Sequence, residues 1–177
     1  MVMKQKRPPA PKTRFVAFVA TSLDGRISLT KQTAPNWTSR EDQVFFQSSL
    51  LQVDAVVVGR NTYHAAARRL RKRNTFVFSS HPKTARRRGT VVFVNPTKVN
   101  LTELFHECST VAVLGGGAVY RFMLERGFLD ELFVTVEPLF FGRGKAMVVG
   151  GTRTTRLHLI SARRLNYSGT LLLHYRI

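Results

Sequence analysis

The sequence has few acidic residues, one cysteine and no long apolar run. Its 177 residues include 28 Lys and Arg but only 10 Asp and Glu, which gives a formal net charge of +18. Because Cys108 is the single cysteine, an internal disulfide is excluded, and we expect a reducing, cytoplasmic setting. No apolar run approaches the roughly 20 residues of a membrane-spanning helix, so we expect no membrane partner.

Motifs of metal and nucleophilic chemistry are also missing. His106 and Cys108 lie close together but lack the second pair of ligands that a zinc site needs, so no metal site is expected. The sequence contains neither a GxSxG nucleophile elbow nor a Walker-type GK[ST] loop. These absences argue against a serine hydrolase and against a P-loop nucleotidase.

The remaining composition suits one folded domain. Hydrophobic residues make up 44% of the chain and charged residues 21%, and the length is that of a single domain. Residues 1–13 are basic and proline-rich, without the apolar centre of a secretory signal. The sequence therefore predicts a flexible basic tail over 1–13 and a single domain over 14–177.

Alternating runs of residues predict an α/β fold. Runs rich in β-branched and aromatic residues predict strands at 14–20, 54–59, 75–80, 90–95, 110–115 and 131–138. Helix-like stretches lie between them, at 38–52, from Asn61 or Thr62 onward, at 101–108 and at 118–127. Such alternation favours a mostly parallel sheet with helices on both faces.

Local sequence signals also mark the start of the first predicted helix and the C-terminal part of the chain. Thr38 and Glu41 have the spacing of a capping box, which predicts the start of the first helix. After residue 145, the stretches 146–151, 157–167 and 169–177 read as strands, the last two joined by a turn at Ser168-Gly169. The predicted sheet therefore has an antiparallel C-terminal edge.

Glycines and polar residues follow three of the predicted strands. Gly115–Gly117 and Gly59-Arg60 each stand between a strand and a helix, where backbone N–H groups at a helix N-terminus can hold phosphate. A sharp turn would explain the three glycines equally well. Ser79-Ser80 ends a third strand, and its hydroxyls suit either a phosphate or a plain turn.

Acidic and basic candidates also have two interpretations each. Asp42 in a first helical turn either stabilises the helix dipole or pairs with a substrate ring nitrogen, with Phe45 or Phe46 packing on that ring. The basic run 68–73 is either a solvated face or an anion site. Its charge also leaves open a non-enzymatic, nucleic-acid-binding protein.

Five stretches in this order resemble the dihydrofolate-reductase-like superfamily, which includes the reductase domain of riboflavin biosynthesis. They are SLDGRIS (22–28), WTSRED (37–42), DAVVVGRNTY (54–63), GGGAVY (115–120) and ERGFLDELFVTVEPLFFGRGKA (125–146). The likeness spans 14–177 and implies a three-layer α/β/α fold of the dihydrofolate reductase type. It also implies an NADPH-dependent reductase, in which the nicotinamide supplies hydride and a proton arrives separately.

The resemblance also implies roles for individual residues. Asp42, supported by Thr135, would lead the proton to the substrate. Trp37 and Phe46 would wall the substrate pocket, and Lys72 or Arg73 would meet the anionic tail of a small-molecule substrate. The implied NADPH contacts are Gly59, Arg60, Thr62, Ser79, Ser80, Gly115, Gly116, Gly117, Val119 and Tyr120.

The resemblance leaves the substrate open. The end signatures favour the riboflavin branch and a 5-amino-6-ribosylaminouracil phosphate, whereas Trp37 and Asp42 suit dihydrofolate or a related pteridine equally well. The sequence differs from the riboflavin branch at three sites. Residues 66–68 are Ala-Ala-Arg where that branch has Asp-Asp-Pro, Phe18 stands in place of its Lys, and Leu114 stands in place of its Glu. Relatives of that branch also imply a homodimer.

Overall fold

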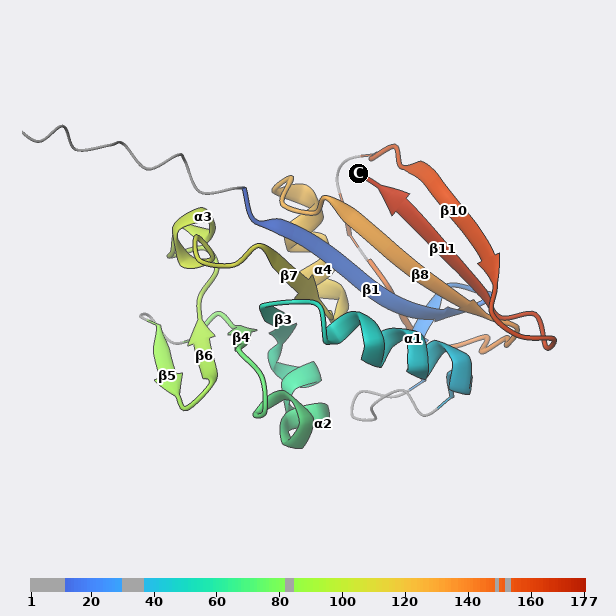
Figure 1. Cartoon of the computed structure of the whole chain (residues 1–177), viewed down its shortest axis with the longest axis horizontal. Coiled ribbons are helices and arrows are strands. Elements are labelled where there is room, and N and C mark those ends of the chain that lie inside the picture. The colour runs from blue at the N-terminus through green and yellow to red at the C-terminus, as the bar shows by residue number, and fades with distance from the viewer. Residues whose placement is uncertain (1–11, 30–36, 82–84, 149, 152–153) are drawn as a thin grey trace, which may run out of the picture.

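A nine-stranded sheet and a separate two-stranded sheet form the framework (Figure 1). The computed structural model describes residues 12–29, 37–81, 85–148, 150–151 and 154–177. The strands are β1 (Arg14–Ser22), β2 (Arg26–Ser28), β3 (Ala55–Gly59), β4 (Thr75–Phe78), β5 (Arg86–Arg88), β6 (Val91–Val94), β7 (Thr110–Val113), β8 (Glu131–Glu137), β9 (Lys145–Ala146), β10 (His158–Arg164) and β11 (Leu171–Arg176). The helices are α1 (Arg40–Leu50), α2 (Arg60–Leu70), α3 (Leu101–Leu104) and α4 (Gly117–Glu125).

The large sheet is parallel in its centre and antiparallel at both edges. Its strand order is β10-β11-β8-β1-β7-β3-β4-β6-β5, and β2 pairs with β9 in the small sheet. β8, β1, β7, β3, β4 and β6 run parallel, whereas β11, β10 and β5 pair in antiparallel fashion. The predicted antiparallel C-terminal edge is therefore confirmed, and the opposite edge is antiparallel as well.

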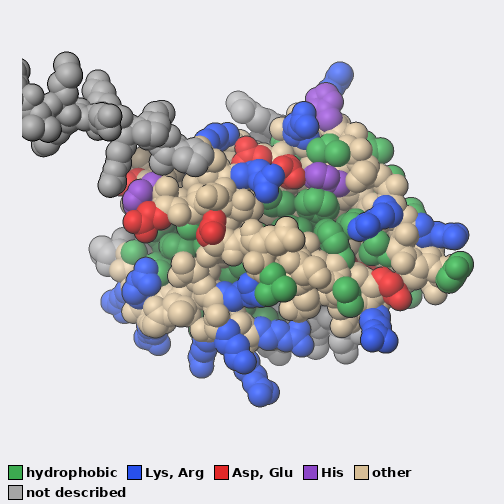
Figure 2. Space-filling view, in the orientation of Figure 1, with side chains coloured by type: hydrophobic (Ala, Val, Ile, Leu, Met, Phe, Trp, Pro, Cys, Tyr) green, Lys and Arg blue, Asp and Glu red, His purple; other side chains and the backbone are tan. Residues whose placement is uncertain are grey.

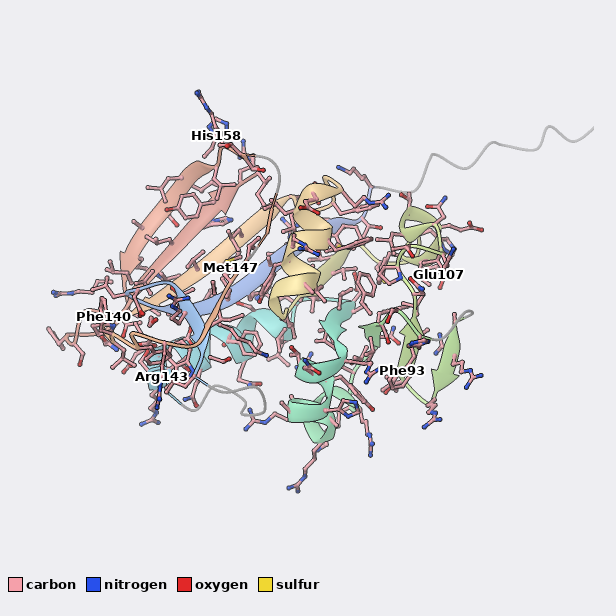
Figure 3. The ribbon with its side chains drawn as sticks, turned by 180° about the vertical axis from the view of Figure 1, so that it is seen from behind. Phe93, Glu107, Phe140, Arg143, Met147 and His158 are labelled. Atoms are coloured by element: carbon pink, nitrogen blue, oxygen red, sulfur yellow. The ribbon has the colours of Figure 1, made fainter. Side chains whose placement is uncertain are left out.

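Helices cover both faces of the sheet. α1 and α2 lie over the face of the sheet that is in front in Figure 1. α4 lies over the opposite face, which is turned toward the viewer in Figure 3. Alternate residues of β1 enter two cores: Phe15 packs on the α3 and α4 side, and Phe18 on the α1 and α2 side. Burial on both faces explains the continuous apolar runs, and the predicted three-layer α/β/α fold is confirmed.

The helix starts differ from the predicted ones by about one residue. The capping box at Thr38 is wrong: Ser39 caps α1 by accepting a hydrogen bond from the Asp42 backbone N–H at 3.3 Å. Glu41 does not reach back to a cap, because its carboxylate accepts from Asn166 at 3.1 Å. α2 begins at Arg60, one residue before Asn61 and two before Thr62, the two predicted starts, with Gly59 as its cap.

Two segments differ more strongly from the predictions. The helix predicted over 101–108 is the single turn α3, because Phe105 leaves helical geometry and is fully buried against Phe15 and Phe76. The strand predicted over 146–151 is reduced to β9, because Met147 packs on the core beside α4 instead of pairing with a strand (Figure 3).

The N-terminal boundary also moves. Residues 1–11 of the predicted tail lie outside the described residues. Thr13 is buried and donates its hydroxyl hydrogen to the Phe105 carbonyl oxygen at 2.9 Å, so the folded part begins before Arg14. In the part of the chain that the structure describes, no helix has the length and apolar character of a membrane span.

Candidate active site

A cleft of about 1240 Å³ opens at the carboxyl ends of the central parallel strands. The ends of β3, β4 and β7 contribute Gly59, Phe78 and Leu114, and α1, α2 and α4 supply the walls together with β2 and β9. Carboxyl ends of parallel strands are where ligands bind in open α/β sheets. The residues that line the cleft divide into a polar, glycine-rich half and an aromatic half.

The glycine-rich half joins the starts of two helices. Gly59 and Gly116 are the caps of α2 and α4. Among the described residues no side chain caps either helix start, so their first N–H groups are candidates to bind a ligand. The Gly59 N–H donates to the Gly115 carbonyl oxygen at 2.7 Å, which holds the two turns together. Two positive helix ends therefore meet at one place, an arrangement suited to an anion.

The glycines differ in what a side chain would meet. A Cβ on Gly117 would lie 2.8 Å from the Met147 carbonyl oxygen, and one on Gly115, whose φ is +86°, would lie 2.6 Å from the Tyr120 ring. A Cβ on Gly116 would lie 3.6 Å from Thr62 Oγ1, in ordinary contact. Gly115 and Gly117 are thus required by the fold, while Gly116 is free to serve the approach of a ligand.

Cations surround this half of the cleft. Arg60 lies in its lining, as the sequence led us to expect, together with Thr62 and Val119. The lining also includes three cations that no sequence motif indicated, Arg26 from β2, Arg121 from α4 and Lys145 from β9. Within the described residues, Arg26 Nε is buried with no hydrogen-bond partner, and it lies 3.7 Å from the Asp24 carboxylate. An unsatisfied donor in a cationic cleft fits an anionic ligand.

The two predicted serines lie beside the cleft rather than in its lining. The Ser79 N–H donates to the Val94 carbonyl oxygen, and its hydroxyl oxygen accepts from the His81 N–H at 3.2 Å. Ser80 accepts from the Asn95 side chain through its carbonyl oxygen at 3.0 Å. Both follow Phe78, which does line the cleft, so they stand at its outer end.

Asp42 faces the aromatic half from the first turn of α1. Its side chain lies in the cleft lining, is 8% exposed, and is hydrogen-bonded by the Thr135 and Thr38 side chains. Burial is the main cause of a raised pKa at Asp42; the two hydrogen bonds oppose it, and the charge of Glu137 adds to it. The structure thus brings Asp42 and Thr135 together, as expected, in a setting that favours a protonated carboxyl.

Phenylalanine rings form the wall beside Asp42. Phe18 and Phe133 stack with centroids 5.2 Å apart and an interplanar angle of 5°, and Phe45 and Phe46 of α1 complete the wall. Phe46, a predicted wall residue of the substrate pocket, lies in the cleft lining. Trp37 is not part of the lining, since it packs edge to face on Phe141 at 5.0 Å.

The basic candidates at the end of α2 and in the turn after it differ in whether they reach the cleft. Arg69 and Arg73 line the cleft, whereas Lys72 does not. Arg73 Nη1 donates to the Leu50 carbonyl oxygen at 2.5 Å, so part of its donor capacity satisfies the C-terminal end of α1. Figure 2 shows Lys and Arg side chains along the lower edge of the molecule, where Figure 1 places α2 and β5.

At three sites the sequence differs from the riboflavin branch. Two of these sites lie wholly in the cleft lining, and the third lies there only in part. Phe18 and Leu114 line the cleft, and of residues 66–68 only Ala66 does. At Ala66 the backbone leaves helical geometry, with φ −127° and ψ 18°. Apolar groups therefore stand where that branch has a lysine and acids.

A carboxylate outside the predicted set holds the wall made by β2 and β9. Asp24 accepts hydrogen bonds from the Ser22 hydroxyl at 2.6 Å and from the N–H groups of Phe141 and Gly142 at 3.0 and 2.9 Å. The bond from Ser22, followed by the bond from Phe141, lowers the Asp24 pKa to about 2. The spacing of Asp24 from residues 141–142 gave no sign of this contact.

The described residues contain no group of three His, Cys, Asp or Glu that could hold a metal ion. The polar groups of the cleft include Asp42, the threonines, the cations and the helix starts. This arrangement can hold an extended anionic ligand along one half of the cleft and present a carboxyl to a flat ring in the other half.

Known proteins share this architecture. A riboflavin biosynthesis protein from Shewanella sp. PV-4 superposes with a TM-score of 0.70 at 20% identity, covering 93% of this chain and 98% of that one. Acinetobacter baumannii RibD has a TM-score of 0.72 at 18% identity, and the match covers 93% of this chain but 58% of that longer one. Enterococcus faecalis dihydrofolate reductase in complex with NADP(H) has a TM-score of 0.67 at 18% identity, over 94% of this chain and 97% of that one.

The family assignment comes from the sequence. Among curated proteins, none matches this chain. The model of the RibD C-terminal domain matches residues 14–171, which is nearly the whole described fold. The protein therefore belongs to the RibD C-terminal domain family, a family of reductases.

Proposed function

We propose that this protein is an NADPH-dependent reductase of a pyrimidine or pteridine, and that its first candidate substrate is a 5-amino-6-ribosylaminouracil phosphate of riboflavin biosynthesis. One observation carries the proposal: a buried carboxyl, Asp42, faces the same cleft as two uncapped helix starts. Family membership supports the reductase chemistry, and the cationic lining supports a phosphorylated cofactor.

The residues present suit NADPH. Gly116 leaves room for close approach to the backbone, Arg60 can grip a phosphate with its planar fork, and Arg26 has an unsatisfied donor in the lining. When bound, NADPH supplies the hydride. The chain's own part is then to hold the substrate ring and to give it a proton.

Asp42 is the group that can supply that proton. Its raised pKa keeps a share of the carboxyl protonated closer to neutral pH than an exposed aspartate, and Thr135 holds its orientation by a hydrogen bond. The rings of Phe18 and Phe133 exclude water and present a flat surface to the substrate. The proton leaves a carboxyl oxygen of Asp42, directly or through water, for the substrate heteroatom at the carbon that receives the hydride.

A second substrate, dihydrofolate or a related pteridine, is favoured by one observation. Phe18, Leu114 and Ala66 make apolar the positions where the riboflavin branch carries charged groups. A flat, uncharged ring suits such a wall better than a phosphoribosyl chain does, while Arg69 and Arg73 can meet an anionic group on either substrate.

The experiment supplies NADPH with each of the two substrates in parallel and follows its oxidation by absorbance, after NADPH binding has been measured by fluorescence. Binding at micromolar NADPH and oxidation with one substrate are expected. Absence of NADPH binding would overturn the proposal. Binding without oxidation by either substrate would retain the cofactor and reject both substrates.

The alternative function, nucleic-acid binding, is supported by the basic surface, but the sequence contains no recognisable nucleic-acid-binding motif. Arg86–Arg88 are exposed on the edge strand β5, and the turn after them lies against the end of α2, where the Thr90 hydroxyl donates to the Arg71 carbonyl oxygen at 2.7 Å. Near this surface Tyr63 and Phe76 are buried, and the half-buried Phe93 packs edge to face on Tyr63 at 5.3 Å, so these rings are already engaged within the fold. A shift assay at physiological salt is expected to show no retention of DNA or RNA.

A further inference from the structure

Glu137 is a second buried carboxylate close to the cleft. Its side chain is 3% exposed, and both of its oxygens accept hydrogen bonds, Oε1 from the Ser39 N–H at 2.6 Å and Oε2 from the Thr170 hydroxyl at 2.7 Å. In the described part of the chain it forms no ion pair with Lys, Arg or His. A buried charge without a cation is costly, so its hydrogen bonds alone hold it in place.

These hydrogen bonds lead to Asp42. The Ser39 hydroxyl oxygen accepts from the Asp42 N–H at 3.3 Å, so the residue that Glu137 fixes is also the cap of the turn that carries Asp42. Thr135 lies two residues before Glu137 on β8, on the same face of the strand, and hydrogen-bonds the Asp42 side chain. β8 therefore holds Asp42 twice, by its side chain and by its helix turn.

We propose that Glu137 is a positioning residue for the reduction: through Ser39 it fixes the first turn of α1, and it places a second buried carboxylate beside the turn that carries Asp42. The inference rests on the proposed function, in which Asp42 gives the proton. The negative charge of Glu137 raises the pKa of Asp42, because a like charge nearby disfavours ionisation. Glu137 thus acts in the same direction as the burial of Asp42, and against the bonds from Thr135 and Thr38.

The other charged groups around Asp42 are exposed or belong to the far wall. On its own helix, Arg40 is exposed and Glu41 is occupied by Asn166. The cations that share the cleft lining are Arg26, Arg60, Arg69, Arg73, Arg121 and Lys145. Of all these charges, that of Glu137 is the one that raises the Asp42 pKa, and both residues are buried, where charges are poorly screened.

Glu137→Gln tests the charge with little change of shape, because glutamine keeps an acceptor for the Ser39 N–H. The pKa of the Asp42 carboxyl is followed by ¹³C NMR, with the signal assigned by its loss in Asp42→Asn, and it is expected to fall in the variant. The alkaline limb of kcat then moves to lower pH, and kcat at neutral pH falls roughly threefold to tenfold, since one pH unit is a tenfold change in the protonated fraction. NADPH affinity should stay unchanged.

Glu41→Gln is the matched control. It makes the same chemical change in the same helix at an exposed acid, and it should leave both the Asp42 titration and the kcat limb in place. Glu137→Asp, which keeps the charge, should hold the Asp42 titration closer to wild type than Glu137→Gln does. An unchanged Asp42 titration in Glu137→Gln would overturn the proposal, whatever the substrate.

Ser39→Gly tests the positioning separately and keeps the helix start, because glycine is a tolerated cap. This variant retains the backbone N–H that Glu137 accepts from, but it lacks the hydroxyl that caps the helix turn of Asp42. The value of kcat should therefore fall, while the alkaline limb of its pH profile should stay in place. An unchanged kcat would refute the positioning through Ser39. The NMR titration needs no substrate; if it shifts while no substrate oxidises NADPH, the reaction is misassigned and the coupling of the two carboxyls stands.

Discussion

The backbone N–H of Gly59 donates to the carbonyl oxygen of Gly115 at 2.7 Å, and this bond joins two glycine turns that lie 56 residues apart in sequence. Because β3 and β7 are neighbours in the sheet, α2 and α4 start side by side. One bond thus joins two local motifs into a single candidate anion site, and the glycines of this site can be tested one at a time.

Gly116→Ala and Gly117→Ala should fail in different ways. Alanine at 117 would place its Cβ 2.8 Å from the Met147 carbonyl oxygen, so the variant should lose about 1–3 kcal/mol of stability through overpacking. Alanine at 116 has ordinary contacts and should fold normally but bind NADPH more weakly, because its methyl group faces the ligand. Thermal unfolding and NADPH fluorescence separate the two effects. Equal NADPH affinity in Gly116→Ala and wild type would contradict the proposed close approach of NADPH to the backbone at Gly116.

Asp42→Asn should abolish most turnover and leave NADPH binding intact. Loss of a proton donor typically costs on the order of a hundredfold to ten-thousandfold in rate. Stability should change with pH: since the folded-state pKa of Asp42 is raised, its favourable contribution is complete below its unfolded pKa of 3.8 and is lost as pH rises through the folded value. Asp42→Asn should therefore unfold at a higher temperature than wild type at neutral pH. A lower unfolding temperature there would show that the ionised carboxyl stabilises the fold.

Asp24→Asn should loosen the cleft wall that β2 and β9 form. The pKa of Asp24 is lowered to about 2, so its contribution to stability is present above its unfolded pKa of 3.8 and is lost as pH falls toward 2. Wild-type unfolding temperature should fall over that interval, and the variant should lack this component and start lower at neutral pH. Identical pH profiles of the two proteins, measured by thermal unfolding, would remove Asp24 from this role.

Arg69→Ala should raise the KM of an anionic substrate, whereas Arg68→Ala should not. Both changes remove one arginine from the last turn of α2, but Arg69 lines the cleft and Arg68 does not. The pair therefore separates a ligand contact from the general effect of the basic surface. Steady-state kinetics at two salt concentrations make the comparison. An equal rise of KM in both variants would assign the effect to long-range charge.

Local patterns in the sequence were sufficient for most of the fold. The apolar runs predicted the central strands because each strand is buried on both faces, as Phe15 and Phe18 of β1 illustrate. They failed at β5, since Arg86–Arg88 looks like a charged loop and becomes a strand only by pairing with β6. They failed again at Met147, whose side chain goes to the core instead of continuing a strand.

Sequence alone indicated the glycine turns and one helix-start acid, Asp42, as candidates for the site, because a glycine after a strand and a carboxylate in a first helical turn are local signals. Only the tertiary structure decided which side chains join them. Glu137, Asp24, Arg121 and Lys145 enter through strand order and through contacts between segments up to 118 residues apart in sequence. Sequence spacing carries no record of such contacts, because they arise when distant strands become neighbours in the sheet.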